Sequence, residues 1–455
     1  MANTADILGE QETLDGLVAH TLENFEDDRI TTVRNGAFYY NDGLKSVNLP
    51  NATTVSNYAF QNCHNIESIK IPKVSRFENY LFSYCYKLNS LDVSEKAERL
   101  SAYCFERCYS LNNFDLSNIT LASETRCLSN TGFGAIVLPN CTSLEAYTGA
   151  GARTSTIDLS KLITISANKF KNAYSLVHLI LRRDAICPLT HTSAFENTPI
   201  GDGLGWIYVP TDLVDSYKTE TNWSTYANQI VSIDEYPKAL GGETITDTWD
   251  EIFQAEDNDT YKTKYNIGDT KYLVIGGTYV LMQIVAFDRD ILSSDGASTA
   301  KITWLAKSIS FDFPMNFKDD TTGGWAECEC RKFLNDIIYE QIPENVRNKI
   351  LAVNKTYMAN ASSSSTTVVS DKLWIPSFRE MFGGSSYENN GIDYTDFFTD
   401  ASAKIKHYGL LTNYSSNWWL RSVVDSSRYS TIGSSGTNAN SSASSLYGIV
   451  LGFCT

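Results

Sequence analysis

Residues 59–72 read Ala-Phe-Gln-Asn-Cys-His-Asn-Ile-Glu-Ser-Ile-Lys-Ile-Pro, and similar stretches stand before and after them. A phenylalanine marks each copy at steps of 22, 22 and 23 residues, at Phe38, Phe60, Phe82 and Phe105. A cysteine follows the last three at a fixed offset, at Cys63, Cys85 and Cys108. Each copy closes with two apolar residues around one polar residue, for example Phe114 and Leu116, which is the pattern of a short strand with one buried face. The period predicts a solenoid in which equivalent side chains stack.

The signature of residues 59–72 resembles that of the BspA-like leucine-rich repeats of bacteria. The resemblance implies a leucine-rich-repeat solenoid over residues 28–237, with a last strand at 207–209. Helical spacing of apolar residues over 212–230 predicts a helix that caps this end. An amphipathic stripe that ends at Phe25 predicts another cap helix over 1–27, and an assembly helix that docks on another protein is the alternative.

The register of Cys63, Cys85 and Cys108 indicates a ladder of buried thiols, because a small apolar residue at one repeat position faces the solenoid interior. The pair Cys328 and Cys330 has no second pair and no nearby histidine, so a zinc site is not expected there. We expect all ten cysteines to be free thiols.

A Gly-, Thr- and Asp-rich stretch predicts a linker at 238–247, followed by a second domain over 248–455. Strands are predicted over 272–275, 279–287 and 301–306, the first two joined at Gly276 and Gly277. Apolar spacing predicts helices over 326–339 and 345–351. A strand over 371–377 is expected to run into a small helix over 378–382, with polar excursions over 362–367 and 383–390.

Two apolar segments near the C-terminus, Trp-Trp-Leu-Arg-Ser at 418–422 and Tyr-Gly-Ile-Val-Leu-Gly-Phe at 447–453, enclose a run of small polar residues. The flanks have the composition of buried strands. Residues 422–446 contain no Lys, Glu, Gln, Met or Trp. A flexible linker has a similar composition. A polar segment held between two core strands, however, is what a recognition surface requires, because loops on a rigid scaffold carry binding.

The second domain resembles a bacterial and phage domain with a C-type-lectin fold, akin to the scaffold of formylglycine-generating enzymes. The resemblance rests on Gly324-Trp325, on residues 331–335 and 371–377, and on the two C-terminal segments. Within this group it resembles the variable proteins of diversity-generating retroelements, in which template adenines are randomised between the two final motifs. Mutation of the first two bases of an Asn codon never yields Lys, Glu, Gln, Met or Trp, the types absent from 422–446.

The resemblance implies a variable ligand-binding segment over about 424–446. The side chains expected to bind ligand are Asp425, Ser427, Arg428, Tyr429, Ser430, Thr431, Ser434, Ser435, Thr437, Asn438, Asn440, Ser441, Ser442, Ser444 and Ser445. We expect most of them to face solvent on one contiguous face, with Tyr429 as the hot spot because it is the only aromatic residue of the segment. Arg421 is expected to be a structural anchor. The expected core residues are Trp418, Trp419, Leu420, Tyr447 and Phe453.

The formal net charge of -16 argues against nucleic acid and against anionic membranes as partners, since both would repel the chain. There is no apolar run of about eighteen residues, the length that a membrane-spanning helix needs. The N-terminal residues lack the basic and apolar regions of a signal peptide. We therefore expect synthesis in the cytoplasm and no membrane insertion.

No catalytic constellation is recognisable. None of the five histidines stands in a metal-binding or catalytic motif. Cys454 is alone near the C-terminus, whereas formylglycine-generating enzymes use a pair of cysteines there. Asp396, Asp400 and Asp425 lack the motifs of a lectin calcium site. We expect no catalytic residue, no cofactor and no metal.

The sequence thus predicts an α+β protein, a leucine-rich-repeat solenoid followed by a C-type-lectin-fold domain, that binds a ligand without catalysis. The favoured function is that of a phage tail-fibre or receptor-binding protein, located in the virion tail, whose partner is a bacterial cell-surface protein or glycan. Other copies of the chain are a further possible partner, in a homo-oligomer formed through the virion or tail. The alternatives are an adhesin of the same family displayed on the bacterial cell surface and, in a different class, an enzyme on the same scaffold.

Overall fold

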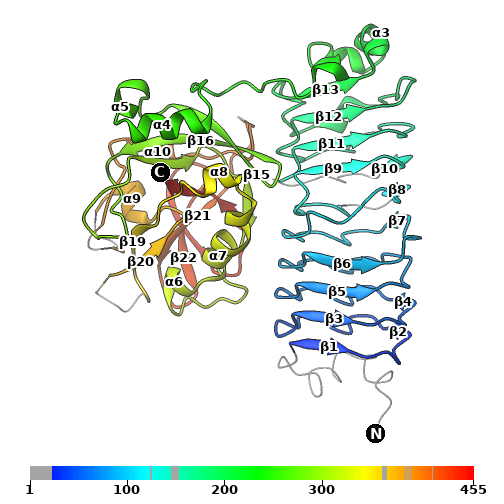
Figure 1. Ribbon diagram of the computed structural model, residues 1–455, viewed down its shortest axis with the longest axis horizontal. Helices are drawn as coiled ribbons and strands as arrows, with labels where there is room; N and C mark the ends of the chain where they lie inside the picture. The colour runs from blue at the N-terminus through cyan, green and yellow to red at the C-terminus, as the bar shows by residue number, and fades with distance from the viewer. Residues whose placement is uncertain are drawn as a thin grey trace. The chain divides into compact units, whose positions relative to one another are not determined.

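The computed structural model describes residues 23–122, 126–144, 153–360, 366–384, 387–388, 391–411 and 413–455. The chain divides into two compact units, Met1–Leu240 (unit 1) and Gly241–Thr455 (unit 2). Figure 1 shows unit 1 in blue to green and unit 2 in green to red. Within the described ranges, no helix has both the length and the apolar character needed to cross a bilayer.

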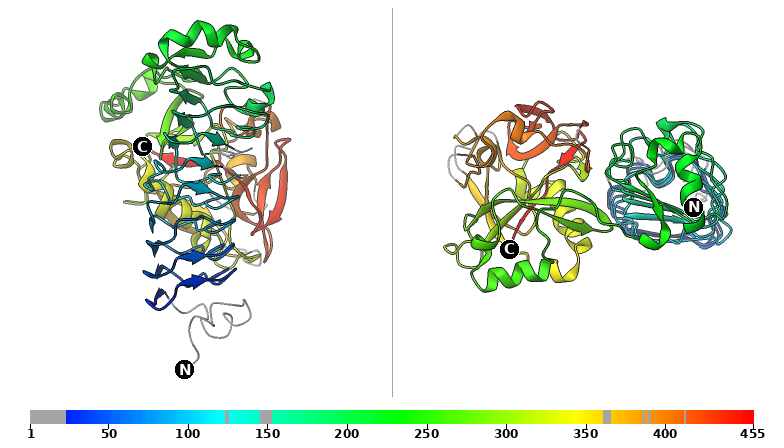
Figure 2. Two further views of the ribbon diagram at one scale, coloured as in Figure 1. Left: turned by 90° about the vertical axis from the view of Figure 1, so that its right-hand side faces the viewer. Right: turned by 90° about the horizontal axis from the view of Figure 1, so that it is seen from above.

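Unit 1 is a stack of coils, most of which add a strand to a parallel sheet (Figures 1 and 2). The first sheet has the order β1 (Asn24–Glu26), β3 (Ser46–Asn48), β5 (Ser68–Ile71) and β6 (Ser90–Val93). The second has β9 (Ala135–Leu138), β11 (Thr156–Leu159), β12 (His178–Leu181), β13 (Trp206–Val209) and β14 (Ile230–Ser232). Equivalent residues pair, as in Val47 opposite Ile69 and Ile69 opposite Leu91. This is the repeat solenoid that the sequence period predicts.

A second side of the coils carries two-residue strands. β2 (Thr32–Val33) pairs with β4 (Thr54–Val55), and β8 (Leu121–Ala122) lies between β7 (Arg99–Leu100) and β10 (Ser143–Leu144). The strand expected around Phe114 and Leu116 is absent, because residues 112–117 have no regular structure. This prediction was wrong: Phe114 and Leu116 keep the apolar spacing of a strand, but the backbone around them pairs with no described strand.

The phenylalanines of the repeats stack in the interior. The ring centroids of Phe38 and Phe60 are 5.1 Å apart, those of Phe60 and Phe82 are 5.8 Å apart, and those of Phe82 and Phe105 are 5.3 Å apart. Each cysteine of the register donates its thiol to the carbonyl of the phenylalanine one coil earlier: Cys63 Sγ to Phe38 O, Cys85 Sγ to Phe60 O and Cys108 Sγ to Phe82 O. The predicted thiol ladder is confirmed, and all ten cysteines are free and buried.

The two ends of the solenoid differ from the prediction. Residues 1–22 of the predicted cap helix lie outside the described residues, and Asn24–Glu26 is a strand whose Phe25 packs against Phe38. The helix expected over 212–230 is instead three short segments, η2 (Thr211–Leu213), α3 (Val214–Thr219) and η3 (Trp223–Tyr226). The break lies at Asn222, whose φ of 63° is not helical. The expected last strand, β13, is followed by β14, which therefore ends this sheet.

Unit 2 begins with two helices, α4 (Trp249–Asp257) and α5 (Tyr261–Lys264), which were not predicted from the sequence. An antiparallel sheet follows, with the order β15 (Thr270–Ile275), β16 (Thr278–Phe287), β17 (Ile302–Ala306) and β25 (Gly452–Cys454). The strands predicted at 272–275, 279–287 and 301–306 are confirmed. Gly276 and Gly277 both have positive φ in the turn between β15 and β16, a conformation that glycine adopts readily.

The predicted helix over 326–339 is a chain of short segments: α6 (Gly324–Glu327), α7 (Glu329–Lys332), the π-helix η5 (Phe333–Ile338) and η6 (Tyr339–Gln341). They are followed by α8 (Glu344–Arg347), the hairpin of β19 (Val353–Tyr357) and β20 (Thr367–Asp371), α9 (Phe378–Phe382) and α10 (Ala401–Lys404). The strand predicted over 371–377 coincides with β20 only at Asp371, and beyond it Trp374 forms a single bridge to Gly452. Most of the two predicted polar excursions lies outside the described residues.

A second sheet of unit 2 has the order β18 (Phe311–Phe313), β24 (Tyr447–Ile449), β21 (Trp418–Val423), β22 (Arg428–Ile432) and β23 (Asn438–Ser442). Trp418, Trp419, Leu420 and Phe453 are fully buried, as expected. Tyr447 is only half-buried, so its assignment to the core was too strong. Its ring lies edge-on to that of Trp419, with 5.2 Å between the centroids.

Replacement of Phe60 by alanine should lower the free energy of unfolding of the full chain by about 3–5 kcal/mol, because it opens a cavity in a stack that both neighbouring coils share. Urea titration followed by circular dichroism measures this loss. Val137→Ala is the control, since Val137 is 49% exposed and its loss should stay within about 0.5 kcal/mol. A loss of less than about 1 kcal/mol for Phe60→Ala would contradict the view that the stacked phenylalanines stabilise neighbouring coils.

The thiols should be unreactive in the native protein. Burial raises the pKa of Cys187 and Cys328 to about 12, and it raises the pKa of the ladder thiols as well. Because the thiolate is the reactive form, a disulfide-exchange reagent at pH 8 should label none of the ten cysteines before unfolding and all of them in denaturant. Rapid labelling of any ladder cysteine in the native state would show that the coils open locally.

Candidate functional site

The segment predicted to bind ligand is a β-hairpin rather than a loop. β22 pairs antiparallel with β21 on one side and with β23 on the other, and Ser430 lies opposite Asn440. β23 forms the edge of the sheet. β21 and β22 run next to each other in Figure 1. Small polar residues occupy strand positions here because neighbouring strands supply the backbone hydrogen bonds, a condition that local composition does not reveal.

The fifteen predicted ligand-binding residues divide into three groups by exposure. Seven are exposed: Arg428, Ser434, Ser435, Thr437, Asn438, Asn440 and Ser444. Five are half-buried: Asp425, Ser427, Ser441, Ser442 and Ser445. Three are buried: Tyr429, Ser430 and Thr431. We call the first two groups together the hairpin face.

Tyr429 cannot be the hot spot in this structure. Its side chain is 0% exposed, and its ring lies edge-on to that of Trp419 at 6.4 Å between the centroids. Ser430 is also buried, where its hydroxyl donates to Asn438 Oδ1 at 2.6 Å. The expectation that these side chains face solvent was wrong, because the rest of unit 2 covers β22 from Tyr429 to Ile432, whereas Arg428 at its start and residues 438 and 440 on β23 are exposed.

The turn of the hairpin has a fixed backbone. The Gly433 amide donates to Thr437 O at 2.8 Å, and the Ser434 amide donates to Asn417 Oδ1 at 3.1 Å. Gly436 has a φ of 78°, and a Cβ atom at this position would lie 1.8 Å from the carbonyl oxygen of Ala401. A side chain at residue 436 would therefore force the turn away from α10, whereas its neighbours at 434, 435 and 437 are exposed.

The loop of residues 316–322 supports the other end of the hairpin, and the sequence analysis did not identify it. Asp319 Oδ1 accepts from the backbone amide of Ser444 at 3.1 Å and from its hydroxyl at 2.7 Å. The hydroxyl of Thr321 donates to the carbonyl of Asp425 at 2.6 Å. The polar composition of 316–322 is typical of a loop, but its contact with Ser444 joins residues 125 positions apart, which no local pattern shows.

The charges on the hairpin face are already paired or hydrogen-bonded. The Arg428 guanidinium lies 2.5 Å from the Asp425 carboxylate. The Ser427 backbone amide, together with Arg428, holds the pKa of Asp425 below its usual value, and Ser444 does the same for Asp319. In the described part of the chain, no cluster of His, Cys, Asp and Glu could hold a metal ion. The groups left to meet a ligand are mostly hydroxyls and amides, which both donate and accept hydrogen bonds.

Arg421, on the buried strand β21, is the structural anchor that the sequence predicts. Its guanidinium makes two hydrogen bonds to Glu380, Nη1 to Oε2 at 2.7 Å and Nη2 to Oε1 at 2.8 Å. Nη1 also donates to Ile375 O, and Nε donates to Thr356 O. Arg421 thus ties β21 to α9 and to β19.

A buried ion network extends from this pair. Lys355 Nζ lies 3.1 Å from Glu380 Oε1 and 2.6 Å from Asp290 Oδ1, and it lies 3.3 Å from the ring centroid of Trp374. Tyr394 donates its hydroxyl to Asp290. Burial by itself would raise the pKa of Glu380, but the charges of Arg421 and Lys355 outweigh it and lower the pKa to about 2. The Glu380 carboxylate therefore stays ionised at neutral pH and, through Arg421, helps to hold the sheet that carries the hairpin.

Two protein families match parts of the chain. Residues 31–151 match the BspA type leucine rich repeat region in six copies, so this part of unit 1 consists of BspA-type leucine-rich repeats. Residues 301–451 match a family described as a domain of unknown function, DUF6273, which includes the hairpin and the loop 316–322. No curated protein matches the chain.

Four chains of solved structures align with the protein, two of which are the following. One is a leucine-rich repeat protein from Bacteroides ovatus ATCC 8483, with 17% identity, a TM-score of 0.28, and coverage of 37% of this chain and 52% of that chain. The other is a leucine rich cell surface protein from Faecalibacterium prausnitzii A2-165, with 16% identity, a TM-score of 0.28, and coverage of 44% and 63%. The chain thus spans less than two thirds of either structure. The fold of unit 1 rests on the repeat match and on the strand pairing instead.

Glu380→Gln should destabilise unit 2 by about 3–5 kcal/mol, because it leaves Arg421 and Lys355 buried with less compensating charge. Since the pKa of Glu380 in the folded protein, about 2, lies below its ordinary value of 4.5, its contribution is complete above about pH 5 and is lost as the pH falls toward 2. The stability gap between wild type and Glu380→Gln, measured by urea titration, should shrink over that interval. Glu344→Gln, at an exposed glutamate of the same unit, is the control and should change little.

Proposed function

We propose that this protein is a non-catalytic adhesion or receptor-binding protein, and that the hairpin face of unit 2 binds a protein or glycan on a bacterial surface. The observation that carries the proposal is the contrast in side-chain exposure between the inner strand β21 and the segment that follows it in the same sheet. β21 is buried along its whole length, whereas twelve of the fifteen predicted side chains of the adjoining segment reach solvent at least in part. A rigid base under an open polar surface suits recognition.

The chemistry of the face supports a ligand that offers many hydrogen bonds. Ser, Thr and Asn dominate it, and such residues provide adaptable hydrogen bonds in antibody paratopes. Sugar hydroxyls and peptide backbones both satisfy this requirement. Without a buried aromatic anchor on the face, affinity for a single site is expected to be modest, and several copies on one surface would compensate for it.

We further infer that unit 2 has the C-type-lectin fold of the variable proteins of diversity-generating retroelements. The absence of Lys, Glu, Gln, Met and Trp from 422–446 supports this inference, as does the position of the segment between β21 and β24. Sequencing of the genomic locus tests it. A neighbouring reverse-transcriptase gene and an adenine-rich copy of the segment would support it, and their absence would contradict it.

A phage tail fibre is the setting that we favour, with display on a bacterial cell surface as the alternative. The resemblance of unit 2 to variable receptor-binding domains supports the first setting, and the BspA-type repeats suit either. Mass spectrometry of purified virions and of proteins shaved from intact cells separates them. Detection in virions alone would support the tail-fibre proposal, and detection on cells alone would contradict it.

Four exposed residues of the hairpin face provide the direct test of binding: Ser434, Ser435, Thr437 and Asn440. Asn438 is left unchanged, because its Oδ1 accepts the hydrogen bond of the buried Ser430 hydroxyl. Joint replacement of the four by alanine should leave the melting temperature within about 2 °C, because surface substitutions have small effects. The same variant should lose at least about tenfold in affinity on a glycan and surface-protein array. Tyr429→Phe should keep both properties, since the Tyr429 side chain is buried.

The matched control replaces Thr263, Ser294 and Asn345, which are exposed residues of unit 2 outside the hairpin face. This variant should bind like the wild type. Unchanged binding by the fourfold variant, or equal loss in the control, would contradict the assignment of the hairpin face.

A further inference from the structure

The strand ladder of unit 1 is interrupted at one coil. β5 and β6 pair in register, with Ile69 opposite Leu91 and Ile71 opposite Val93. The next coil supplies residues 112–117, which form no strand, and β9 in the coil after that pairs only with β11. Among the described residues, β6 therefore has a strand partner on one side only, and its other edge presents backbone amides and carbonyls to whatever lies there.

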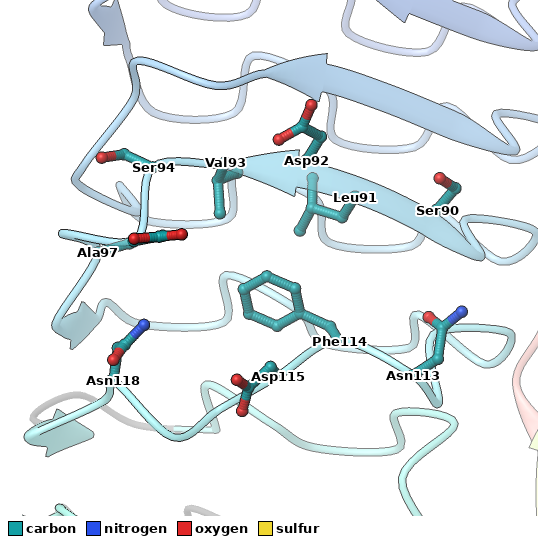
Figure 3. A pocket seen from close by; sticks show the side chains of 11 residues that line it. Ser90, Leu91, Asp92, Val93, Ser94, Ala97, Asn113, Phe114, Asp115 and Asn118 are labelled. Carbon is teal, nitrogen blue, oxygen red and sulfur yellow. The ribbon is translucent and has the colours of Figure 1, made fainter.

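A cleft of about 320 Å³ opens along this edge, between β6 and residues 113–118. Figure 3 shows Leu91 on β6 and Phe114 on the facing segment directed into the space between them. Leu91 and Val93 are half-buried, whereas their counterparts one coil earlier, Ile69 and Ile71, are 1% and 0% exposed. The interruption thus uncovers apolar side chains that a regular coil would cover.

The cleft is also negatively charged. The carboxylates of Asp92, Glu95 and Asp115 line it, and no lysine or arginine does. None of the three forms an ion pair with a described residue. The Asp115 carboxylate accepts hydrogen bonds from the amide and hydroxyl of Ser117, which fix its position beside the cleft. An uncompensated set of three carboxylates favours a cationic ligand.

We propose that this cleft binds an extended, basic segment of a partner protein, which adds as a strand to the free edge of β6. Strand addition would satisfy the unpaired backbone groups of β6. Because side chains alternate along a strand, the segment would place small apolar residues against Leu91 and Phe114 and lysine or arginine toward Asp92 and Asp115. This site belongs to unit 1 and is independent of the hairpin face.

The charge of the chain argues against its own segments as the occupant. The formal net charge is -16, and residues 1–22 contain no lysine or arginine. A second copy of the chain, or this N-terminal segment, would bring like charge to the three carboxylates. A foreign segment with alternating apolar and basic residues complements both the apolar wall and the carboxylates.

The test uses the full chain and three fluorescent octapeptides: alternating Lys-Val, alternating Glu-Val, and the Lys-Val peptide with every second amide methylated. Anisotropy titration should show saturable binding of the Lys-Val peptide and at least about tenfold weaker binding of the other two, because one lacks the charge and the other the backbone donors. Hydrogen exchange of the amides over residues 90–94 should slow when the Lys-Val peptide is bound.

The variant Asp92→Asn with Asp115→Asn should bind the Lys-Val peptide at least about tenfold more weakly at low salt. Its control, Glu67→Gln with Asp212→Asn, removes the same charge from exposed positions outside the cleft and should bind like the wild type. Circular dichroism confirms that both variants are folded.

Several results would overturn the proposal. Equal affinity for the Glu-Val or the methylated peptide would exclude charge recognition or strand addition. Binding without slowed exchange over residues 90–94 would place the peptide elsewhere. No binding of any peptide would mean that the carboxylates merely protect a free edge from association, as charged residues on edge strands do. Self-association of the wild type that the Asp92→Asn, Asp115→Asn variant loses would identify a second copy as the occupant.

Discussion

The requirement that backbone amides and carbonyls of every strand find partners organises both units of this protein. In unit 1, each coil satisfies it by pairing with the coil before it, so the Phe and Cys ladders form as a consequence of the register. At the far end the short segments η2, α3 and η3 fold beside the last strands, and Trp223 donates its indole N–H to Cys187 O. β6 and β23 are edge strands with a strand partner on one side only among the described residues, and each borders a proposed binding surface.

The repeats could be predicted from the sequence because the same buried positions recur at a short, regular spacing. A buried position that recurs every 22 or 23 residues identifies itself, and Phe60 and Cys63 occupy the places that their spacing predicts. The break in the strand ladder after β6 could not be predicted, because Phe114 and Leu116 keep the apolar spacing of a strand. Leu116 remains in the interior, yet the segment around it forms no ladder. Apolar spacing therefore records which side chains are buried, and only partly whether the backbone is paired.

In unit 2 the sequence identified the scaffold better than the site. The apolar flanks at 418–422 and 447–453 correspond to β21, β24 and β25, and Arg421 proved to be an anchor because an arginine within an apolar strand needs a buried partner. That the partner is Glu380, or that Asp319 supports Ser444, could not be predicted, since these contacts join distant parts of the chain. The hairpin itself was hidden, because Ser, Asn and Gly have no preference for strands and enter them only when neighbours provide the pairing.

The position of each residue within the hairpin decides what it can contribute to recognition. On β22, Tyr429, Ser430 and Thr431 are buried, because the rest of unit 2 covers both faces of the sheet there. β23 has one partner, and residues 438 and 440 on it are exposed. At the turn, a side chain at residue 436 would clash with the Ala401 carbonyl, whereas the side chains at 434, 435 and 437 are exposed. A ligand-binding surface on this fold can therefore vary at the exposed positions 434, 435, 437 and 440 with little loss of stability, because the backbone pairing that holds them does not depend on those side chains.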